Sequence, residues 1–142
     1  ELDARLCISY ITKELRSSIP EEQRSAVGQH VFGCDICQDV CPWNRRAPDT
    51  APPANPALFA PPLARLAAIT ETQFKQMFRQ TPVNRAKYSA FLRNVAVAMG
   101  NSGLEKFLEP LSRLAASPDP LVSEHAIWAI TKLAPSSKVE ST

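Results

Sequence analysis

The sequence of 142 residues lacks long apolar runs and is poor in glycine. No stretch approaches the roughly 20 consecutive apolar residues that cross a bilayer, and the first residues contain no apolar segment of a signal peptide. We therefore expect no association with a membrane, and a cytoplasmic location. Only four glycines stand against 13 prolines, and Val, Ile and Thr form no alternating runs. This pattern predicts a mainly α protein whose helices are joined by proline-rich connections.

A strong charge of either sign is also absent, because the net charge is only +2. So small an excess is compatible with nucleic-acid binding but does not argue for it. No residue has the setting of a general acid or a nucleophile. The two histidines, His30 and His125, are isolated, and we expect both to be structural. The sequence does not begin with Met, which suggests that it was cut from a longer protein.

Three zones follow one another along the chain. Residues 1–46 hold every cysteine, and residues 47–62 contain too many prolines for regular structure. Residues 63–142 have the composition and spacing of helices. The sequence therefore predicts a cysteine-bearing segment, an extended connector and a helical domain.

In the first zone, the apolar spacing predicts a single helix over residues 3–15, which begins at an aspartate suited to capping. A second, short helix is predicted to open at Pro20, because proline suits the first helical turn. Gly28 is the expected stop. Gly33 directly precedes a cysteine, and we expect it to let the backbone pass close to a bulky group.

In the third zone, Thr70 or Thr72 is predicted to cap a helix that ends at residues 81–82. Gly100 and Gly103 are expected to bracket a turn. The other predicted helices span residues 85–99, 104–116 and 121–133.

An internal repeat lies in this third zone. Residues 91–99 and 122–130 share most of their apolar positions at a constant shift of 31 residues (122 minus 91), and Ala98 falls on Ala129. One helix lies between the two copies, which is typical of helix pairs stacked as a short solenoid. The segment 118–130 resembles a HEAT repeat. The alternative is that two ordinary amphipathic helices agree by chance.

The cysteines carry the strongest functional signal of the sequence. Bacterial ferredoxins use the run C-x2-C-x2-C-x3-C-P, in which the fourth cysteine binds a different cluster from the first three. This chain reproduces the last three cysteines and the proline, Pro42, but has Val31 where the first would fall. The four cysteines are Cys7, Cys34, Cys37 and Cys41.

We assign Cys7, Cys34 and Cys37 to one iron–sulfur cluster and Cys41 to a second. The first cluster then lacks one ligand and the second lacks three, so the sequence predicts a further cysteine run upstream. A four-cysteine zinc site is the main alternative, because zinc also takes four thiolates. Zinc sites usually pair two C-x2-C knuckles, whereas this chain has one. Disulfides and four unrelated cysteines are weaker alternatives.

These motifs resemble those of epoxyqueuosine reductase, and the resemblance covers nearly the whole chain. A HEAT-like tail fits the same family. The matching residues are Leu2-Asp3-Ala4-Arg5-Leu6-Cys7-Ile8-Ser9-Tyr10, Gly33-Cys34-Asp35-Ile36-Cys37-Gln38-Asp39-Val40-Cys41-Pro42-Trp43-Asn44, Thr81-Pro82-Val83-Asn84-Arg85 and Arg93-Asn94-Val95-Ala96-Val97-Ala98-Met99-Gly100-Asn101.

The resemblance implies an oxidoreductase that reduces epoxyqueuosine in tRNA to queuosine with a cobalamin and two [4Fe–4S] clusters. An N-terminal cobalamin domain would be a partner outside this chain, and the full-length protein is expected to be a monomer. Ser9, Asp35 and Ile36 would face the cobalamin. The alternatives are that the Ser9 hydroxyl bonds to its own helix and that Asp35 caps a turn. Trp43 is expected to pack over a cluster.

The resemblance also implies binding of RNA. Basic residues after the cluster loop and on the first solenoid helices would contact phosphates. The alternative for any one of them is an ordinary solvated charge. The candidates are Arg45, Arg46, Arg85, Lys87 and Arg93, with Lys75 and Arg79 nearby.

Two hypotheses of function remain from the sequence. The first is the electron-transferring and tRNA-docking portion of an epoxyqueuosine reductase, inactive as an isolated fragment. The second is a HEAT-like interaction module with a structural zinc knuckle and no catalysis. Bound iron and broad visible absorbance would support the first, and one zinc per colourless chain the second.

Overall fold

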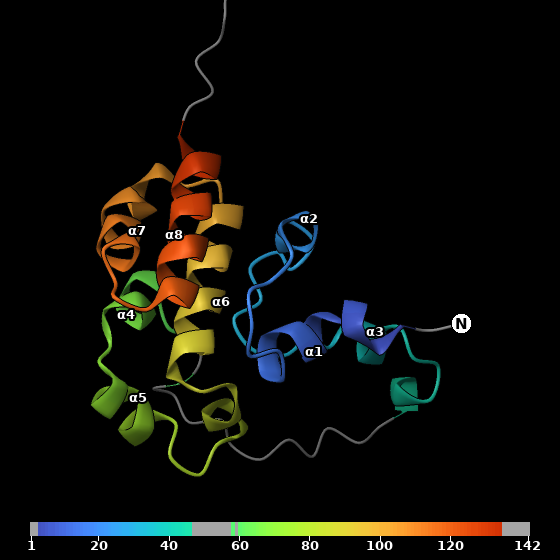
Figure 1. Ribbon diagram of the computed structural model, residues 1–142. Helices are drawn as coiled ribbons and strands as arrows, with labels where there is room; N and C mark the ends of the chain where they lie inside the picture. Colours follow the sequence, from blue (N-terminus) through green and yellow to red (C-terminus); the bar gives the residue numbers. More distant parts are fainter. Residues whose placement is uncertain (1–2, 47–57, 59, 135–142) are drawn as a thin grey trace, which may run out of the picture.

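Three helices form the centre of the computed structural model, which describes residues 3–46, 58 and 60–134. They are α6 (Tyr88–Asn101), α7 (Leu108–Ala115) and α8 (Pro120–Leu133). The colours of Figure 1 show that α6 and α8 run in the same direction. Helix α7, which lies between them in the sequence, runs in the opposite direction. The described residues form helices and no strand, as the sequence predicts.

Helix α6 is the central element of the core. Every residue from Ala90 to Gly100 is buried, which is expected for a helix that is apolar on nearly all sides. Helix α8 packs along it so closely that a Cβ atom built on Gly100 would lie 2.8 Å from the Cβ of Ala129. The prediction of Gly100 as a turn residue is therefore wrong. It lies inside α6, where its missing side chain allows the close approach of α8.

The repeat seen in the sequence corresponds to α6 and α8. The first residues of the two helices, Tyr88 and Pro120, are 32 positions apart (120 minus 88), and the last, Asn101 and Leu133, are also 32 apart (133 minus 101). Asp119 caps α8 by accepting a hydrogen bond from the backbone N–H of Leu121 at 2.9 Å. The solenoid interpretation of this pair stays a prediction.

Two short helices cover one end of the bundle, α4 (Leu63–Ala68) and α5 (Glu71–Met77). Thr70 begins α5 through a capping box with Gln73, so of the two predicted caps the first is correct. Phe74 on α5 packs with its ring centroid 5.0 Å from that of Phe91 on α6. This contact joins the two helices to the core.

The boundaries of two predicted helices differ from the structure. A 3-10 helix, Pro82–Ala86, precedes α6, and Lys87 between them has a φ of 64° that a helix cannot contain. The predicted helix 104–116 likewise begins with a 3-10 turn, Glu105–Phe107, before α7. Gly103, with a φ of 69°, does lie in the turn.

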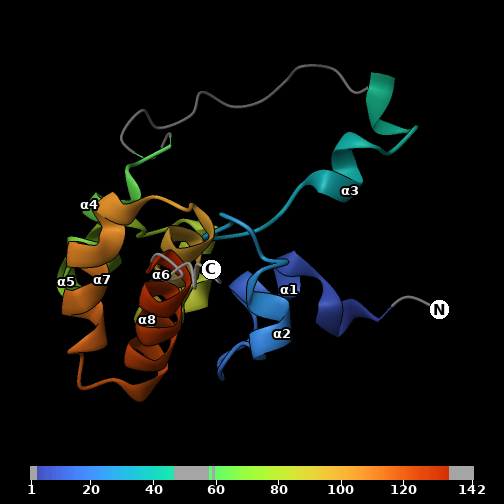
Figure 2. The same ribbon diagram turned by 90° about the horizontal axis from the view of Figure 1, so that it is seen from above.

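The first zone packs beside this bundle rather than within it. The elements here are a 3-10 helix Ala4–Leu6, α1 (Ile8–Lys13), α2 (Glu21–Arg24), α3 (Ile36–Asp39) and a 3-10 helix Asn44–Arg46. Helix α3 extends away from the bundle (Figure 2). The prediction of one helix over residues 3–15 is wrong, because Cys7 has an extended backbone (φ −73°, ψ 128°) that divides it in two.

The first zone and the bundle share a small apolar core. Ile11, Ile19 and Val27 from the first zone surround Val97 of α6, and all four are buried. Residues 47–57 and 59 of the predicted connector lie outside the described residues. Leu58 packs against the main core of the bundle.

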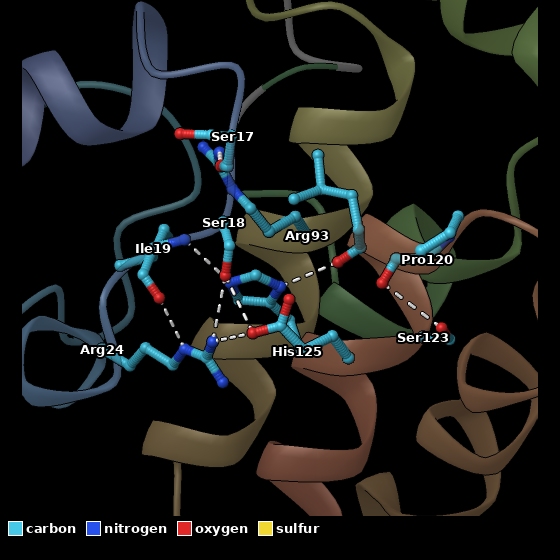
Figure 3. A network of polar contacts seen from close by, with 10 residues as sticks. Ser17, Ser18, Ile19, Arg24, Arg93, Pro120, Ser123 and His125 are labelled. Carbon is cyan, nitrogen blue, oxygen red and sulfur yellow. Dashed lines mark hydrogen bonds and ion pairs between the residues drawn. The ribbon is translucent and has the colours of Figure 1, made fainter.

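Polar contacts join the same two parts (Figure 3). His125 of α8 is fully buried, and its Nε2 accepts a hydrogen bond from the backbone N–H of Ile19 at 3.1 Å. Its Nδ1 then carries the proton and donates to the carbonyl of Leu121 at 2.8 Å. Burial lowers the pKa of His125 to about 4, so it is neutral. The structural role expected for this histidine is confirmed.

None of the described helices has both the length and the apolar character that a membrane span requires.

Candidate functional site

The four cysteines all lie in the first zone, in or next to its short helices. Cys7 directly precedes α1, Cys34 lies two residues before α3, Cys37 is within α3, and Cys41 follows it. All four are free thiols; Cys7 and Cys37 are exposed, and Cys34 and Cys41 are half-buried. The thiols are therefore accessible to a metal group from outside the bundle.

The donor set suits a thiolate-bound metal group in its chemistry, because thiolates are the ligands of iron–sulfur clusters. Within residues 3–46, 58 and 60–134, no three His, Cys, Asp or Glu side chains gather around one point. Among the described residues, the thiols are therefore spread along the first zone and do not form a closed metal site.

Cys34 opens onto a hollow of about 450 Å³ beside α1 and α3. Gly33 has a φ of 75°, and a Cβ atom built on it would lie 3.3 Å from Cε of Lys13. The close passage expected at Gly33 is thus observed, and the bulky neighbour is the Lys13 side chain. The hollow is lined by Lys13, His30, Phe32, Gly33, Cys34, Asp35, Ile36 and Asp39.

Two of the three residues expected to face a cobalamin border this hollow. Asp35 precedes α3 and is exposed, and its side chain forms no capping hydrogen bond. Ile36 begins α3 and is 55% exposed. Ser9 lies in the first turn of α1 and is half-buried. The role of these residues toward a cofactor stays a prediction.

The predicted RNA-contacting bases lie in different settings. Arg45 follows the cysteine loop and is exposed, and the side chain of Arg46 lies outside the described residues. Arg85 is exposed although its Nε is 2.8 Å from Oε1 of Glu14. Lys87 is exposed at the start of α6. Contact of these residues with RNA stays a prediction.

Arg93 differs from the other bases, because it is fully buried. Its Nη2 donates to the carbonyl of Ile11 at 2.8 Å, and its Nη1 donates to the carbonyls of Leu15 and Ser17 at 3.0 and 2.6 Å. Burial lowers its pKa to about 10, so it remains charged at neutral pH. The prediction that Arg93 contacts RNA is wrong in this structure, because its guanidinium is enclosed by the first zone.

Sequence reasoning missed Thr12 and Asn94. Both are fully buried polar residues that connect α6 with the segments next to the cysteines. The Nδ2 atom of Asn94 donates to the carbonyls of Thr12 and Val31 at 2.8 and 2.9 Å. A signal was present, because Arg93 and Asn94 interrupt an otherwise apolar helix, and a buried polar pair needs partners.

Arg24 was also missed. It is 5% exposed, its Nε donates to the carbonyl of Ile19 at 2.8 Å, and its guanidinium pairs with Glu124 of α8 (Figure 3). Trp43, expected to pack over a cluster, is 90% exposed among the described residues. The packing of Trp43 over a cluster stays a prediction.

Comparison with known sequences identifies the first zone. Residues 1–44 match the family described as "4Fe-4S double cluster binding domain". The Escherichia coli (strain K12) epoxyqueuosine reductase is 39% identical over 135 residues, which cover 92% of this chain and 35% of that protein. The Pseudomonas aeruginosa epoxyqueuosine reductase is 42% identical over 135 residues, which cover 92% and 37%.

Solved structures agree in fold. Epoxyqueuosine reductase from Bacillus subtilis superposes with a TM-score of 0.85 and 31% identity, over 94% of this chain and 37% of that one. A crystal structure of epoxyqueuosine reductase with an epoxyqueuosine-modified tRNA-Tyr stem loop gives a TM-score of 0.81 and 31% identity, over 94% and 36%. The chain thus spans little more than a third of the proteins it matches.

Proposed function

We propose that this chain, a relative of the epoxyqueuosine reductases over nearly its whole length, forms the cluster-bearing and C-terminal helical part of such an enzyme. It would carry electrons through two [4Fe–4S] clusters to a cobalamin, for the reduction of epoxyqueuosine to queuosine in tRNA. The observation that carries the proposal is the position of all four cysteines within residues 1–44, the part that matches a double cluster binding domain.

In this proposal, Cys7, Cys34 and Cys37 hold one cluster and Cys41 the other. The division is supported by the x3 step before Cys41, which in ferredoxins directs that cysteine to a different cluster. The exposure of Cys7 and Cys37 leaves room for ligands from elsewhere. Clusters of this kind supply single electrons, and the protein sets their potential through burial and hydrogen bonds near the sulfurs.

The apolar surface of the first zone supports a partner domain. Five of the seven large exposed apolar side chains among the described residues lie in this zone, and the other two, Leu104 and Ile127, belong to the bundle. Exposed apolar surface marks sites of protein contact, and we propose that the cobalamin domain upstream covers these side chains. The apolar residues concerned are Leu6, Tyr10, Ile36, Val40 and Trp43.

We further propose that Arg45, Arg46, Arg85 and Lys87 contact tRNA. The relative crystallised with a tRNA stem loop supports RNA as the partner. The three of these bases whose side chains are described are exposed. The helical part would serve as a HEAT-like docking platform, and a tRNA substrate fits a cytoplasmic enzyme.

Metal analysis of the full-length protein, purified without oxygen, tests the proposal. Two [4Fe–4S] clusters correspond to about eight iron atoms per protein. The Cys37→Ala and Cys41→Ala variants should each lose the electron paramagnetic resonance (EPR) signal of a different cluster, whereas the Ser112→Ala control on α7 should keep both.

The opposite result would be a colourless protein with one zinc per chain. That result would favour the interaction module with a structural zinc knuckle. Loss of the same signal in both cysteine variants would contradict the division of the cysteines between two clusters.

A further inference from the structure

Two asparagines on α6 hold the first zone by the same kind of contact. Asn94 donates both Nδ2 hydrogens to main-chain carbonyls, those of Thr12 and Val31. Asn101 does the same with the carbonyls of Arg24 and Gly28, each at 2.8 Å. The two asparagines are seven residues apart (101 minus 94), which is about two helical turns, so they lie on one face of α6. Only Asn94 reaches segments next to cysteines.

The Thr12 side chain joins α1, which Cys7 directly precedes, to the segment that carries Cys34. Its hydroxyl donates to the carbonyl of Ile8 at 2.8 Å and accepts from the backbone N–H of Gly33 at 2.9 Å. Ile8 follows Cys7 and Gly33 precedes Cys34. The bond to Ile8 lies within α1, and the bond from Gly33 crosses to the other segment. One buried hydroxyl therefore holds the residue before Cys34 against the helix that begins directly after Cys7.

Asn94 has a single possible orientation. Its Oδ1 accepts from Nη2 and Nε of Arg93, at 2.8 and 3.1 Å. If the amide were rotated by half a turn, its oxygen would face the carbonyls of Thr12 and Val31 and its nitrogen the guanidinium, so Asn94 would lose its hydrogen bonds to all three groups. The bridge therefore has one arrangement of donors and acceptors, and it starts from a helix whose residues 90–100 are all buried.

We propose that Thr12 and Asn94 are positioning residues that set the geometry, and with it the potential and lifetime, of the cluster shared by Cys7, Cys34 and Cys37. This inference rests on the proposed function. Its physical basis is that residues behind the ligands orient them and tune the metal group, and that their loss typically costs about 10–100-fold in metal affinity or activity. Asn101 makes an equivalent contact away from the cysteines and therefore lacks this effect.

The test compares Asn94→Ala with Asn101→Ala in the full-length protein. Both variants should lower the melting temperature, because each leaves two carbonyls without a donor. Only Asn94→Ala should shift the reduction potential and EPR spectrum of the cluster that Cys37→Ala removes. It should also speed the loss of that cluster to an iron chelator by about ten-fold or more.

A second pair of variants acts on the hydroxyl alone. Thr12→Val keeps the shape of the side chain and should reproduce the spectral change and the faster cluster loss, even if Asn94→Ala fails to fold. Thr12→Ser retains the hydroxyl and should restore wild-type behaviour.

The outcomes separate this inference from the proposed function. Iron-loaded wild-type protein with an unchanged potential, spectrum and cluster lifetime in Thr12→Val would overturn the inference alone. Equal changes in Asn94→Ala and Asn101→Ala would also overturn it, because they would indicate a general loss of stability. Zinc in place of iron in the wild type would overturn the proposed function, and the inference with it.

Discussion

Burial decides the role of the polar residues that interrupt the apolar helix α6. Arg93 and Asn94 stand between Leu92 and Val95, and all four are buried. A cation taken out of water requires compensation, which Arg93 finds in carbonyl oxygens of the first zone. A base within a helix that is apolar on all sides is thus a structural residue, unlike the exposed Arg45.

At the same scale, His125 should make stability depend on pH. Its pKa is lowered from 6.5 to about 4 by burial, so the folded state resists a proton that the unfolded state accepts. The contribution of His125 to the free energy of unfolding is fully present above about pH 6.5. It decreases as the pH falls from 6.5 to about 4, and it does not change further below pH 4. The loss should reach about 3 kcal/mol.

Denaturant unfolding at several pH values checks this expectation. Most of the window lies above the range in which Glu124, whose pKa is lowered from 4.5, can contribute. His125→Gln should remove the loss between pH 6.5 and 5. A variant that keeps the same slope there would show that another group is responsible.

At the scale of elements, the contact of α6 with α8 depends on a glycine. A Cβ atom on Gly100 would lie 2.8 Å from Cβ and 2.9 Å from Cα of Ala129, so the backbone of α8 would have to move. Gly100→Ala should therefore destabilise the protein by about 1–3 kcal/mol, despite the better helix propensity of alanine.

A double-mutant cycle isolates this contact. Ala129→Gly removes the opposing Cβ. The free energy of unfolding of the Gly100→Ala/Ala129→Gly double variant should therefore be higher than the value obtained by adding the losses of the two single variants. Additive free energies of unfolding would show that the Cβ atom of Ala129 takes no part in the contact.

The sequence contains most of the information about elements but little about their interruptions. The cap at Thr70 and the break before α8 follow from local chemistry and are correct. The break at Cys7 and the positive φ of Lys87 are not predictable from spacing, because the apolar pattern continues across both positions. The cysteine ligands can be predicted from the sequence because their spacing is a local motif. The bridge through Thr12 cannot, because it joins residues that are distant along the chain.

At the scale of the whole molecule, exposed bases should make RNA binding depend on salt. Arg45→Ala with Lys87→Ala should weaken binding of a tRNA stem loop and lower the slope of log K against log salt by about two, one for each phosphate that the variant no longer neutralises. Lys106→Ala with Arg113→Ala, which removes two exposed charges near α7, serves as the control. Binding measured by fluorescence anisotropy in full-length protein checks both.

An equal change of slope in the two double variants would contradict the assignment. It would indicate that RNA responds to the total charge of the protein rather than to this surface.

The small core around Val97 has a consequence for how the protein comes apart. Ile11, Ile19 and Val27 share it with α6, and Arg24 and Arg93 add polar contacts between the same two parts. We therefore expect the two zones to unfold as a single cooperative unit. A peptide bond cut between residues 46 and 60 should leave both fragments associated, and fragments made separately should recover their structure only when mixed. Evolution could then exchange or lengthen the connector freely, but it could not transplant the cysteine segment without the face of α6 on which it rests.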